Sequence, residues 1–433
     1  MNTSITLQVG KCDNTKSLPE WLCYLETLHP QEIELGLERV QRVFQRQNLR
    51  ELGHKVVVVA GTNGKGSTIA MLESILLNAG YSVGSYTSPH LHHYNERVRV
   101  NGIDTDDASL CRAFARVEYA RGSTSLSYFE FGTLAAFDLF SRHKLDVVLL
   151  EVGLGGRLDA VNIIDADISV ITSIDIDHEE WLGKDREAIG FEKAGIMRKG
   201  HTTVCGERDV PESIKAAAQR VGADLSVLGE DFDVQRHGDE WDWLDHGTAT
   251  INDLVRPALG ADCQYDNAAV AVAVLQQLVD FPVDTFDIVE GLELVQCLGR
   301  FERHLGTTDC VFDVAHNPAS AAALAKTLAN EKVQGQTRLV FGVMADKDIE
   351  QIISSLAGET TQWYLAAPNI ARAAEPATVK DVCISKGIAS AKVACFDSVS
   401  DAFKHAQEDS GINDRVVVCG SFYTVAEAMA QQL

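Results

Sequence analysis

The sequence predicts an α/β protein of two domains, each built on a mainly parallel β-sheet covered by helices. Candidate strands and helices alternate along most of the 433 residues, and such alternation is typical of parallel sheets. The chain is also too long for one ordinary hydrophobic core, so two domains are expected. We place the boundary so that residues 1–297 form the first domain and residues 298–433 form the second.

The first predicted strand leads directly into a glycine-rich loop. Four consecutive valines within Lys55–Ala60 predict a buried strand, because a short β-branched run disfavours a helix. The loop Gly61–Ser67 follows, and Ile69–Leu76 then shows helical spacing of apolar residues. A strand, a glycine loop and a helix together cradle phosphates, since backbone N–H groups and the helix dipole attract an anion.

This loop departs from the standard phosphate-binding pattern at two positions. Val59 stands where the pattern has its first glycine, and Gly66 stands where it has Ser or Thr. A turn that merely joins strand to helix is the alternative, but such a turn does not need three glycines, a lysine and two hydroxyls. We therefore expect Lys65 to contact the outer phosphates and the hydroxyl of Ser67 or Thr68 to reach Mg²⁺. The first domain is predicted to be a P-loop ATPase domain.

The other elements are predicted from apolar periodicity and turn residues. Further strands are expected at Tyr81–Tyr86, Asn95–Val100, Leu145–Glu151, Ile168–Ser173 and Thr202–Cys205. Helices are expected at Leu18–Leu28, Leu35–Gln47, Asp107–Ala120, Phe129–His143, Asp185–Ile196, Pro211–Val221 and Asn267–Val279. Tryptophans that alternate with acids predict a small antiparallel hairpin within Phe232–His246.

A second, smaller series of elements predicts a Rossmann-like α/β domain at the end of the chain. It contains four strands, expected at Cys310–Val314, Arg338–Phe341, Gln362–Ala366 and Arg415–Cys419. A helix is expected at Ala319–Leu328, and a closing helix follows the last strand.

The composition limits the partners of this protein. A net charge of −24 argues against nonspecific nucleic-acid binding, which needs excess Lys and Arg. Ten cysteines are scattered without a CxxC pair, as in proteins of a reducing compartment. Residues 1–6 lack the basic start and apolar run of a signal peptide, and no apolar stretch approaches the roughly 20 residues that cross a bilayer. We expect a cytoplasmic protein with no membrane partner.

Polar side chains follow several predicted strands, at the sheet edge where α/β proteins bind ligands. Glu151 and His178 are candidate Mg²⁺ ligands, although either could serve only a structural role. Ser88 could bind metal or simply form a turn. Asp313 and His316 end a strand of the second domain before a proline-started helix, which suits contact with a nucleotide or a substrate.

Seven motifs occur in the same order as in a known family. They are Gly61–Ser67, Thr87–Leu91, Glu151–Asp159, Asp177–His178, Glu192–Ile196, Gly299–Glu302 and Asp313–Pro318, and Ile33–Val40 fits as well. Over nearly its whole length the chain resembles the folylpolyglutamate synthases of the Mur ligase superfamily. The resemblance is strongest to the bacterial bifunctional form, which is also a dihydrofolate synthase.

The resemblance implies an ATP-dependent amide ligase that is cytoplasmic and monomeric. In this reaction ATP phosphorylates a pterin carboxylate, and the amine of L-glutamate displaces phosphate from the acyl phosphate, with release of ADP. The acceptors would be dihydropteroate, which gives dihydrofolate, and tetrahydrofolates, which give polyglutamates. A phosphoryl group that moves between two anions needs neutralising cations, and Lys65, Arg300 and Mg²⁺ would supply them.

The resemblance also implies roles for individual residues. ATP would be held by Gly61, Thr62, Asn63, Gly64, Lys65, Gly66, Ser67, Asn267, Arg300 and Asp313. Two Mg²⁺ sites would use Ser67, Ser88, Glu151, His178 and Lys193. The pterin would contact Glu34, Leu35, Ser127, Tyr128, Phe129, Glu130, Leu158, Asp159 and Ala160. Lys65, Lys193 and His316 are the expected catalytic residues.

For Lys193, the composition and the family resemblance lead to different predictions. Composition alone predicts a solvated lysine or a partner of Glu192, whereas the resemblance implies a lysine that is carboxylated and binds the second Mg²⁺. The chain also departs from the family's pattern at Glu34, Leu298 and Val314, where Asp, Pro and Gly are usual. None of these departures removes a proposed chemical group.

Three alternative functions remain open at the level of the sequence. Two are ligases, namely a monofunctional folylpolyglutamate synthase and a Mur-type ligase of a cell-wall nucleotide. The third is a P-loop nucleotide switch, which is disfavoured because the chain has no Asn-Lys-x-Asp motif for reading a guanine base.

Overall fold

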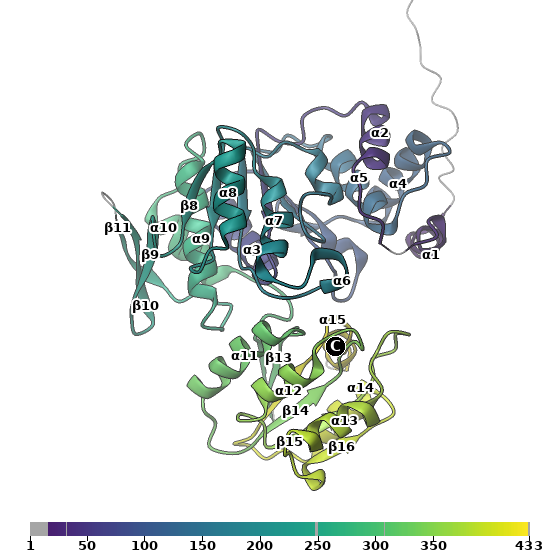
Figure 1. Cartoon of the computed structure of the whole chain (residues 1–433), viewed down its shortest axis with the longest axis vertical. Helices are drawn as coiled ribbons and strands as arrows, with labels where there is room; N and C mark the ends of the chain where they lie inside the picture. The colour runs from purple at the N-terminus through teal and green to yellow at the C-terminus, as the bar shows by residue number, and fades with distance from the viewer. Residues whose placement is uncertain (1–15, 32, 247–249, 307, 432–433) are drawn as a thin grey trace, which may run out of the picture.

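The computed structural model describes residues 16–431 except residues 32, 247–249 and 307, so residues 1–6 lie outside it. Two α/β bodies are stacked along the long axis of the molecule (Figure 1). Each contains its own mainly parallel sheet, which confirms the predicted fold class. None of the helices in the described ranges is long and apolar enough to cross a membrane.

The first body is built around an eight-stranded sheet with the strand order β4-β3-β2-β5-β1-β6-β7-β8. The strands β2, β5, β1, β6, β7 and β8 are parallel, and β3 and β4 add an antiparallel edge. Their bounds are β1 Lys55–Ala60, β2 Val83–Tyr86, β3 Val98–Val100, β4 Ile103–Asp104, β5 Val147–Glu151, β6 Ile168–Ile171, β7 Thr202–Cys205 and β8 Asp224–Val227.

Helices cover both faces of this sheet, which is why its central strand is apolar at successive positions. Val57 and Val59 of β1 pack with α3, α9 and α10, whereas Val56 and Val58 pack with helices on the opposite face. The helices are α1 Leu18–Leu28, α2 Glu38–Gln47, α3 Lys65–Asn78, α4 Asp107–Arg121, α5 Tyr128–Phe140, α6 Glu179–Leu182, α7 Arg186–Lys193, α8 Glu212–Val221, α9 Gln264–Gln277 and α10 Thr285–Leu294.

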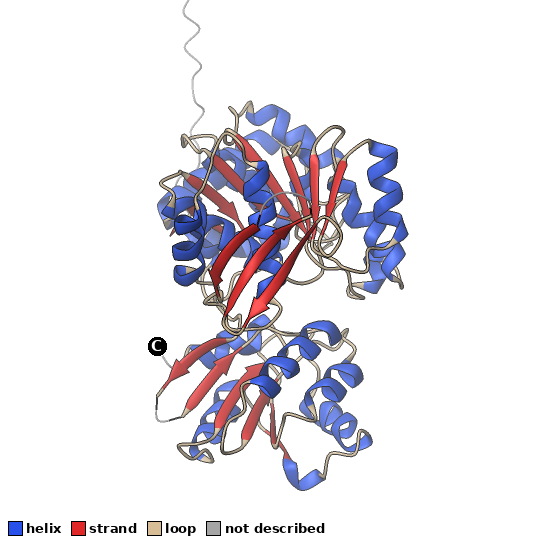
Figure 2. Ribbon diagram, turned by 90° about the vertical axis from the view of Figure 1, so that its left-hand side faces the viewer, coloured by secondary structure: helices blue, strands red, loops and turns tan. Residues whose placement is uncertain are grey.

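The predicted hairpin is confirmed, and a third strand extends it. The strands β9 Phe232–His237, β10 Glu240–Asp245 and β11 Thr250–Val255 form an antiparallel sheet in the order β11-β10-β9, visible in front of the main sheet in Figure 2. The indole N–H of Trp243 donates to the Ala269 carbonyl of α9 at 3.1 Å. This bond and the burial of Trp241 and Trp243 fix the small sheet against the first body.

The second body has a six-stranded sheet in the order β12-β13-β17-β14-β15-β16. Only the edge strand β12 is antiparallel. The strands are β12 Glu302–Leu305, β13 Asp309–Phe312, β14 Thr337–Phe341, β15 Gln362–Leu365, β16 Val393–Cys395 and β17 Arg415–Cys419. The helices α11 Pro318–Asn330, α12 Ile349–Leu356 and α13 Pro376–Ser385 cover one face, and α14 Val399–Glu408 and α15 Phe422–Met429 cover the other.

Two sequence predictions about local structure were wrong. The helix expected from Leu35 begins at Glu38. The segment Asn95–Val100 is a strand only from Val98, because Tyr94–Arg97 forms a 3₁₀ turn. The Glu96 carboxylate accepts backbone N–H groups of three preceding residues, Leu91, His92 and His93, at 2.6–2.8 Å. These bonds hold a tight loop where alternation alone suggested an extended strand.

Candidate active site

A cleft of about 500 Å³ lies between the two bodies. Residues that follow β1, β5 and β6 line it from the first body, and residues that follow β13, β14 and β17 line it from the second. The carboxyl ends of two parallel sheets therefore face one cleft, which is where open α/β sheets bind ligands. Every predicted nucleotide, metal and catalytic residue lines this cleft: Gly61, Thr62, Asn63, Gly64, Lys65, Gly66, Ser67, Ser88, Glu151, His178, Lys193, Asn267, Arg300, Asp313 and His316.

The glycine loop joins β1 to the N-terminus of α3, as the sequence predicts. Lys65 is the first residue of α3, and its Nζ donates to the carbonyls of Gly61 at 2.9 Å and Thr62 at 3.2 Å. Burial lowers the pKa of Lys65, and the nearby carboxylates Glu151 and Asp177 oppose that effect. The lysine is thus held at the centre of the loop, where an anion bound by the helix N-terminus would meet it.

Glycine is required at position 64 by a close approach to α9. Gly64 has φ +88°, and a Cβ there would lie 2.5 Å from Oδ1 of Asn267. Asn267 is itself oriented by Gln264, whose Oε1 accepts from its Nδ2 at 2.9 Å. The loop and α9 therefore meet through a side chain that the family resemblance assigns to the nucleotide.

Glu151 is a buried carboxylate at the end of β5. Its Oε2 accepts the backbone N–H of Ser88 at 2.9 Å. Burial raises the pKa of Glu151, and Lys65 partly offsets this rise. A buried acid that has one protein donor and faces a phosphate loop favours a bound cation.

The residues around Glu151 fit a magnesium ion. The carboxylate faces the loop, since a Cβ on Gly66 would lie 4.0 Å from its Oε2. Among the described residues, no group of three or more His, Cys, Asp or Glu side chains could hold a metal ion. The ion would therefore depend on one carboxylate, the Ser67 and Ser88 hydroxyls, water and phosphate oxygens. Mg²⁺ is bound in this way when a substrate phosphate completes its shell.

Lys193 is buried at the end of α7, with 2% of its surface exposed. Within residues 16–431 and outside the gaps given above, its Nζ forms no hydrogen bond or ion pair. Burial, together with the charge of Lys65, lowers the pKa of Lys193 to about 7, against the pull of Asp177 and Asp175. The amine is therefore substantially neutral near pH 7. The composition-based prediction of a solvated lysine was wrong.

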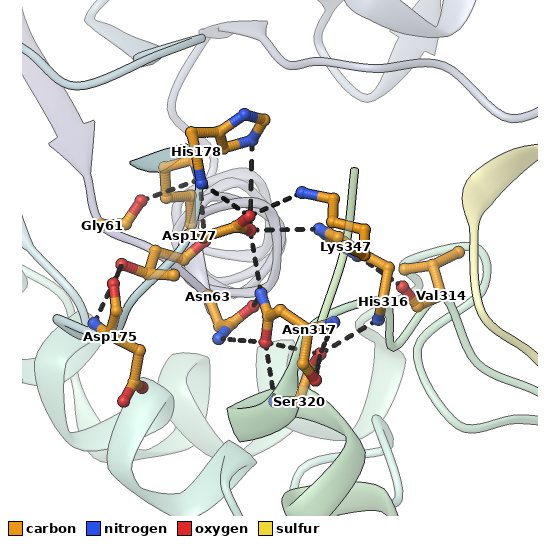
Figure 3. A network of polar contacts seen from close by, with 12 residues as sticks. Gly61, Asn63, Asp175, Asp177, His178, Val314, His316, Asn317, Ser320 and Lys347 are labelled. Atoms are coloured by element: carbon orange, nitrogen blue, oxygen red, sulfur yellow. Dashed lines mark hydrogen bonds and ion pairs between the residues drawn. The ribbon is translucent and has the colours of Figure 1, made fainter. Parts of the chain in front are cut away.

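Asp177 connects the two bodies at the mouth of the cleft (Figure 3). Its Oδ1 lies 2.6 Å from Nζ of Lys347, and its Oδ2 accepts from Nδ2 of Asn317 at 3.1 Å. His178, in a left-handed conformation with φ +53°, donates its backbone N–H to the same carboxylate at 2.8 Å. Burial alone would raise the pKa of Asp177, but Lys347 and the neighbouring histidines hold it well below its usual range.

The second body contributes its groups from the loop after β13. Asp313 accepts the backbone N–H groups of Phe301 at 2.9 Å and Ala315 at 2.8 Å, so it fixes the junction between the bodies. His316 bonds through Nδ1 to the Val314 carbonyl at 2.8 Å, which places its proton on Nδ1 and leaves Nε2 facing the cleft. Burial lowers the pKa of His316 to about 4. Its ring is therefore neutral at pH 7.

Arg300 lies between the two bodies. Its guanidinium stacks over the Phe422 ring at 5.1 Å, and its Nη2 would be 3.8 Å from a Cβ on Gly66. The arginine therefore faces the phosphate loop from the junction.

The nine predicted pterin residues do not line this cleft, but they lie together on the first body. Three of their side chains are used to build local structure. Ser127 and Glu130 form a capping box at the start of α5, and Asp159 caps a 3₁₀ turn by accepting the N–H of Val161 at 3.0 Å. Asp159 also accepts the N–H of Leu154, a residue that lines the cleft, at 2.9 Å. The pterin segments are thus adjacent to the cleft, and Phe129 lies against Gly153 at its edge.

Glu34 belongs to a charged network that joins these segments. Its carboxylate contacts Arg39 and lies 2.6 Å from Nε2 of His29. Arg39 in turn binds Oε1 of Glu130 at 2.9 Å. Glu34 is therefore held from both sides.

Comparisons with known proteins agree with this architecture. The Mur ligase middle domain matches residues 59–237, and the Mur ligase glutamate ligase domain matches residues 299–422. The dihydrofolate synthase/folylpolyglutamate synthase of Escherichia coli (strain K12) is 43% identical over 413 residues, which cover 95% of this chain and 94% of that protein. The enzyme of the same name from Haemophilus influenzae is 37% identical and covers 96% of this chain and 98% of that protein.

The chain belongs to the dihydrofolate synthase/folylpolyglutamate synthase family. Solved structures of the family have the same fold. An E. coli FolC structure in complex with DHPP and ADP has a TM-score of 0.92 at 42% identity and covers 97% of this chain and 98% of that chain. A bifunctional family structure with Mn, AMPPNP and L-glutamate bound has a TM-score of 0.89 at 43% identity, with the same coverage. A Mycobacterium tuberculosis folylpolyglutamate synthase complexed with ADP has a TM-score of 0.86 at 27% identity.

Lys347 was missed as a site residue by the sequence reasoning, and Asp177 was noted only as part of a family motif. Both follow strands that end at the cleft, Asp177 after β6 and Lys347 after β14. The rule that polar residues after parallel strands bind ligands applies to Lys347 as well as to His178. Nothing local in the sequence, however, pairs two residues that are 170 positions apart.

Proposed function

We propose that this chain is an ATP-dependent amide ligase that adds L-glutamate to dihydropteroate and to tetrahydrofolates. One observation carries the proposal: the phosphate loop of one body and the Asp313–Asn317 loop of the other face each other across a single cleft. A reaction that moves a phosphoryl group to a carboxylate and then replaces it by an amine needs such convergence, because three substrates must meet in a site that excludes water. Relatives that cover nearly the whole chain bear the names of both synthase activities.

The nucleotide would lie across the cleft. Gly61 to Ser67 would surround its phosphates with backbone N–H groups, and Lys65 would exchange its carbonyl partners for phosphoryl oxygens. Asn267, Arg300 and Asp313 would hold the rest of the molecule from α9 and the junction. The proposed division into residues 1–297 and 298–433 assigns ATP and the pterin mainly to the first domain and glutamate to the second. It is supported by the start of the glutamate ligase domain match at residue 299.

Glu151, Ser88 and Ser67 would hold one Mg²⁺, and His178 would hold a second together with Lys193. When bound, the metal would neutralise negative charge on the oxygens of the transferred group. Lys193 suits the carboxylated role that the family resemblance implies, since an amine with a pKa of about 7 is partly neutral and so can add to CO₂. A lysine carbamate would then supply oxygen ligands in place of an uncompensated buried amine.

The chain's own residues suggest how the steps proceed. Lys65 and Arg300 both face the cleft at the phosphate loop and would clamp the phosphoryl group while the pterin carboxylate attacks it. The amine of glutamate then displaces phosphate from the acyl phosphate. His316 is neutral at pH 7, so its Nε2, which faces the cleft 3.7 Å from Oδ2 of Asp177, can accept a hydrogen bond from this amine. We expect the two domains to close further on ATP, because the ligands come from both.

The decisive experiment supplies purified protein with ATP, Mg²⁺, L-glutamate and one pterin acid at a time. Mass spectrometry should show one added glutamyl unit on dihydropteroate and on tetrahydrofolate, and the nucleotide product should be ADP rather than AMP. Addition to tetrahydrofolate alone would identify a monofunctional synthase. Absence of product and of ATP consumption with every pterin acid would overturn the proposal.

We further propose that the protein is monomeric and acts in the cytoplasm. Cys205, Cys383 and Cys419, which are buried in the described part of the chain, are free thiols, as expected in a reducing compartment. Light scattering coupled to size-exclusion chromatography should give one chain per particle, and a dimer would contradict this part of the proposal.

A further inference from the structure

Arg97 is a half-buried cation without a carboxylate partner. Its Nε donates to Nδ1 of His90 at 2.8 Å, and its guanidinium lies over the rings of Tyr94 at 5.3 Å and Tyr128 at 5.6 Å. Among the described residues, its side chain forms no ion pair and no other hydrogen bond. Its Nη1 and Nη2 groups therefore have N–H donors to spare.

The neighbours of Arg97 do not neutralise its charge. The imidazole nitrogen of His90 that accepts from Nε carries no proton, so the ring contributes no negative charge and only orients the guanidinium. Glu96 is adjacent in sequence, but its carboxylate is used by the backbone N–H groups of Leu91, His92 and His93. A half-buried cation that is stacked on two aromatic rings and keeps free donors is prepared for an anionic ligand.

The position of Arg97 indicates which anion it binds. Tyr128, over which it stacks, belongs to the predicted pterin segment. The backbone carbonyl of Arg97 accepts the N–H of Thr87 at 2.9 Å, and the next residue, Ser88, lines the cleft. Arg97 thus lies against the pterin segment and beside the Thr87–Ser88 turn at the cleft, near the place where the carboxylate must meet the phosphoryl group.

We propose that Arg97 binds the carboxylate of the pterin acid through Nη1 and Nη2 and holds one carboxylate oxygen toward the phosphate loop. This inference rests on the proposed function and adds to it the residue that recognises the acceptor's anionic end. The planar guanidinium matches a carboxylate in two-point geometry, which a lysine ammonium does not. His90 acts as a positioning residue, since its bond to Nε fixes the plane of the guanidinium.

The proposal predicts a selective kinetic defect. Loss of charge-assisted hydrogen bonds to a carboxylate should raise the KM for the pterin acid by about 10-fold to 100-fold in Arg97→Gln. The KM values for ATP and glutamate should not change. Arg97→Lys keeps the charge but loses the two-point geometry, so its KM should fall between those of wild type and Arg97→Gln. Arg112→Gln is the matched control, because Arg112 is an exposed arginine on α4 that donates to the Ser109 hydroxyl.

A binding measurement separates this proposal from the proposed function. Fluorescence titration should show that wild type prefers pteroic acid to its carboxamide, and that Arg97→Gln binds the two about equally. A normal pterin KM in an active, folded Arg97→Gln variant, or a changed KM for ATP instead, would overturn the role of Arg97 and leave the ligase intact. A wild-type enzyme that neither binds nor ligates pterin acids would overturn both. Thermal melting of each variant identifies loss of folding.

Discussion

The carboxylate of Asp177 and the ammonium of Lys347 lie 2.6 Å apart and join the two domains across the cleft. Both side chains are about nine-tenths buried, at 9% and 10% exposure. Removal of one partner therefore leaves a desolvated charge without compensation, which typically costs about 3–5 kcal/mol. This pair makes the relative position of the domains depend on electrostatics inside the active site.

We expect Asp177→Asn to open the cleft and to lower kcat/KM. The amide still accepts the His178 N–H but no longer compensates the charge of Lys347, so the closed arrangement loses stability. Small-angle scattering should show a larger radius of gyration for the variant. In Asp177→Asn with Lys347→Met part of the loss should be recovered, because the buried charge is also removed. Lys386→Met, which breaks an exposed pair with Glu350, is the control; unchanged scattering for Asp177→Asn would refute the expectation.

The Asp177–Lys347 pair also makes the stability of the contact between the domains depend on pH. The folded-state pKa of Asp177 lies below its value in an unfolded chain, which is about 3.9. Its contribution to stability is therefore complete above that value and is lost as the pH falls through the folded-state pKa. The scattering profile of wild type should stay constant from neutral pH to about pH 5. Opening between pH 7 and 5 would show that a different group controls the contact.

Lys65→Ala should abolish ligation while the protein still folds. The lysine is the cation that the loop holds against the transferred phosphoryl group, and one such donor is typically worth at least about 10²-fold in kcat. ADP release, measured with every substrate present, is the assay. Lys144→Ala, at an exposed lysine of the same domain, should retain full activity. Near-normal turnover by Lys65→Ala would mean that another cation carries out this role.

Local sequence signals predicted the nucleotide side of the cleft well. The strand, glycine loop and helix around Lys65 are adjacent in sequence, and the rule about strand ends places Glu151 and His178 at the same edge without knowledge of any contact. Contacts between distant residues could not be predicted in this way. Asn63 and Asn317 exchange amide hydrogen bonds at 3.3 and 3.0 Å across 254 positions, and no local pattern encodes that pairing.

Some sequence signals were present but were assigned to a different role. Ser127 and Glu130 have the spacing of a capping box before an apolar run, and the structure uses both side chains to cap α5. We therefore expect the pterin to contact the backbone at the start of α5 more than the polar groups of Ser127 and Glu130. The burial of Lys193 depends on the packing of α7 against the rest of the domain, so composition predicted a solvated lysine instead.

Lys193→Ala should be strongly impaired and partly rescued by small carboxylates such as acetate. The proposed carbamate serves only as a donor of oxygen ligands, so a free carboxylate that enters the space left by the side chain can replace it in part. Activity measured against acetate concentration is the test. Rescue should be absent in Lys65→Ala, whose missing group is a cation. A high-resolution map with an unmodified amine far from any metal would end the carbamate proposal.

Formation of this carbamate should also depend on pH in a defined direction. The neutral amine reacts with CO₂, and the pKa of Lys193 is about 7 in the folded protein. Protonation below pH 7 therefore removes the reactive form, and the fraction of modified protein should fall as the pH decreases from 8 to 6. Carbon-13 NMR of protein equilibrated with labelled bicarbonate would measure it directly. A constant signal over this range would contradict the assigned chemistry.

Glu34→Asp should weaken binding of the pterin without affecting ATP. Glu34 contacts Arg39 and His29 at the same time, and Arg39 continues the network to Glu130. An aspartate is one methylene shorter, so it can keep only one partner, and the loss of one hydrogen bond is worth roughly 3-fold to 10-fold in KM for dihydropteroate. Glu38→Asp, at an exposed position four residues later, is the matched control. If Glu34→Asp instead lowered that KM, aspartate would be the better residue here, and the network would not be the feature that positions the pterin.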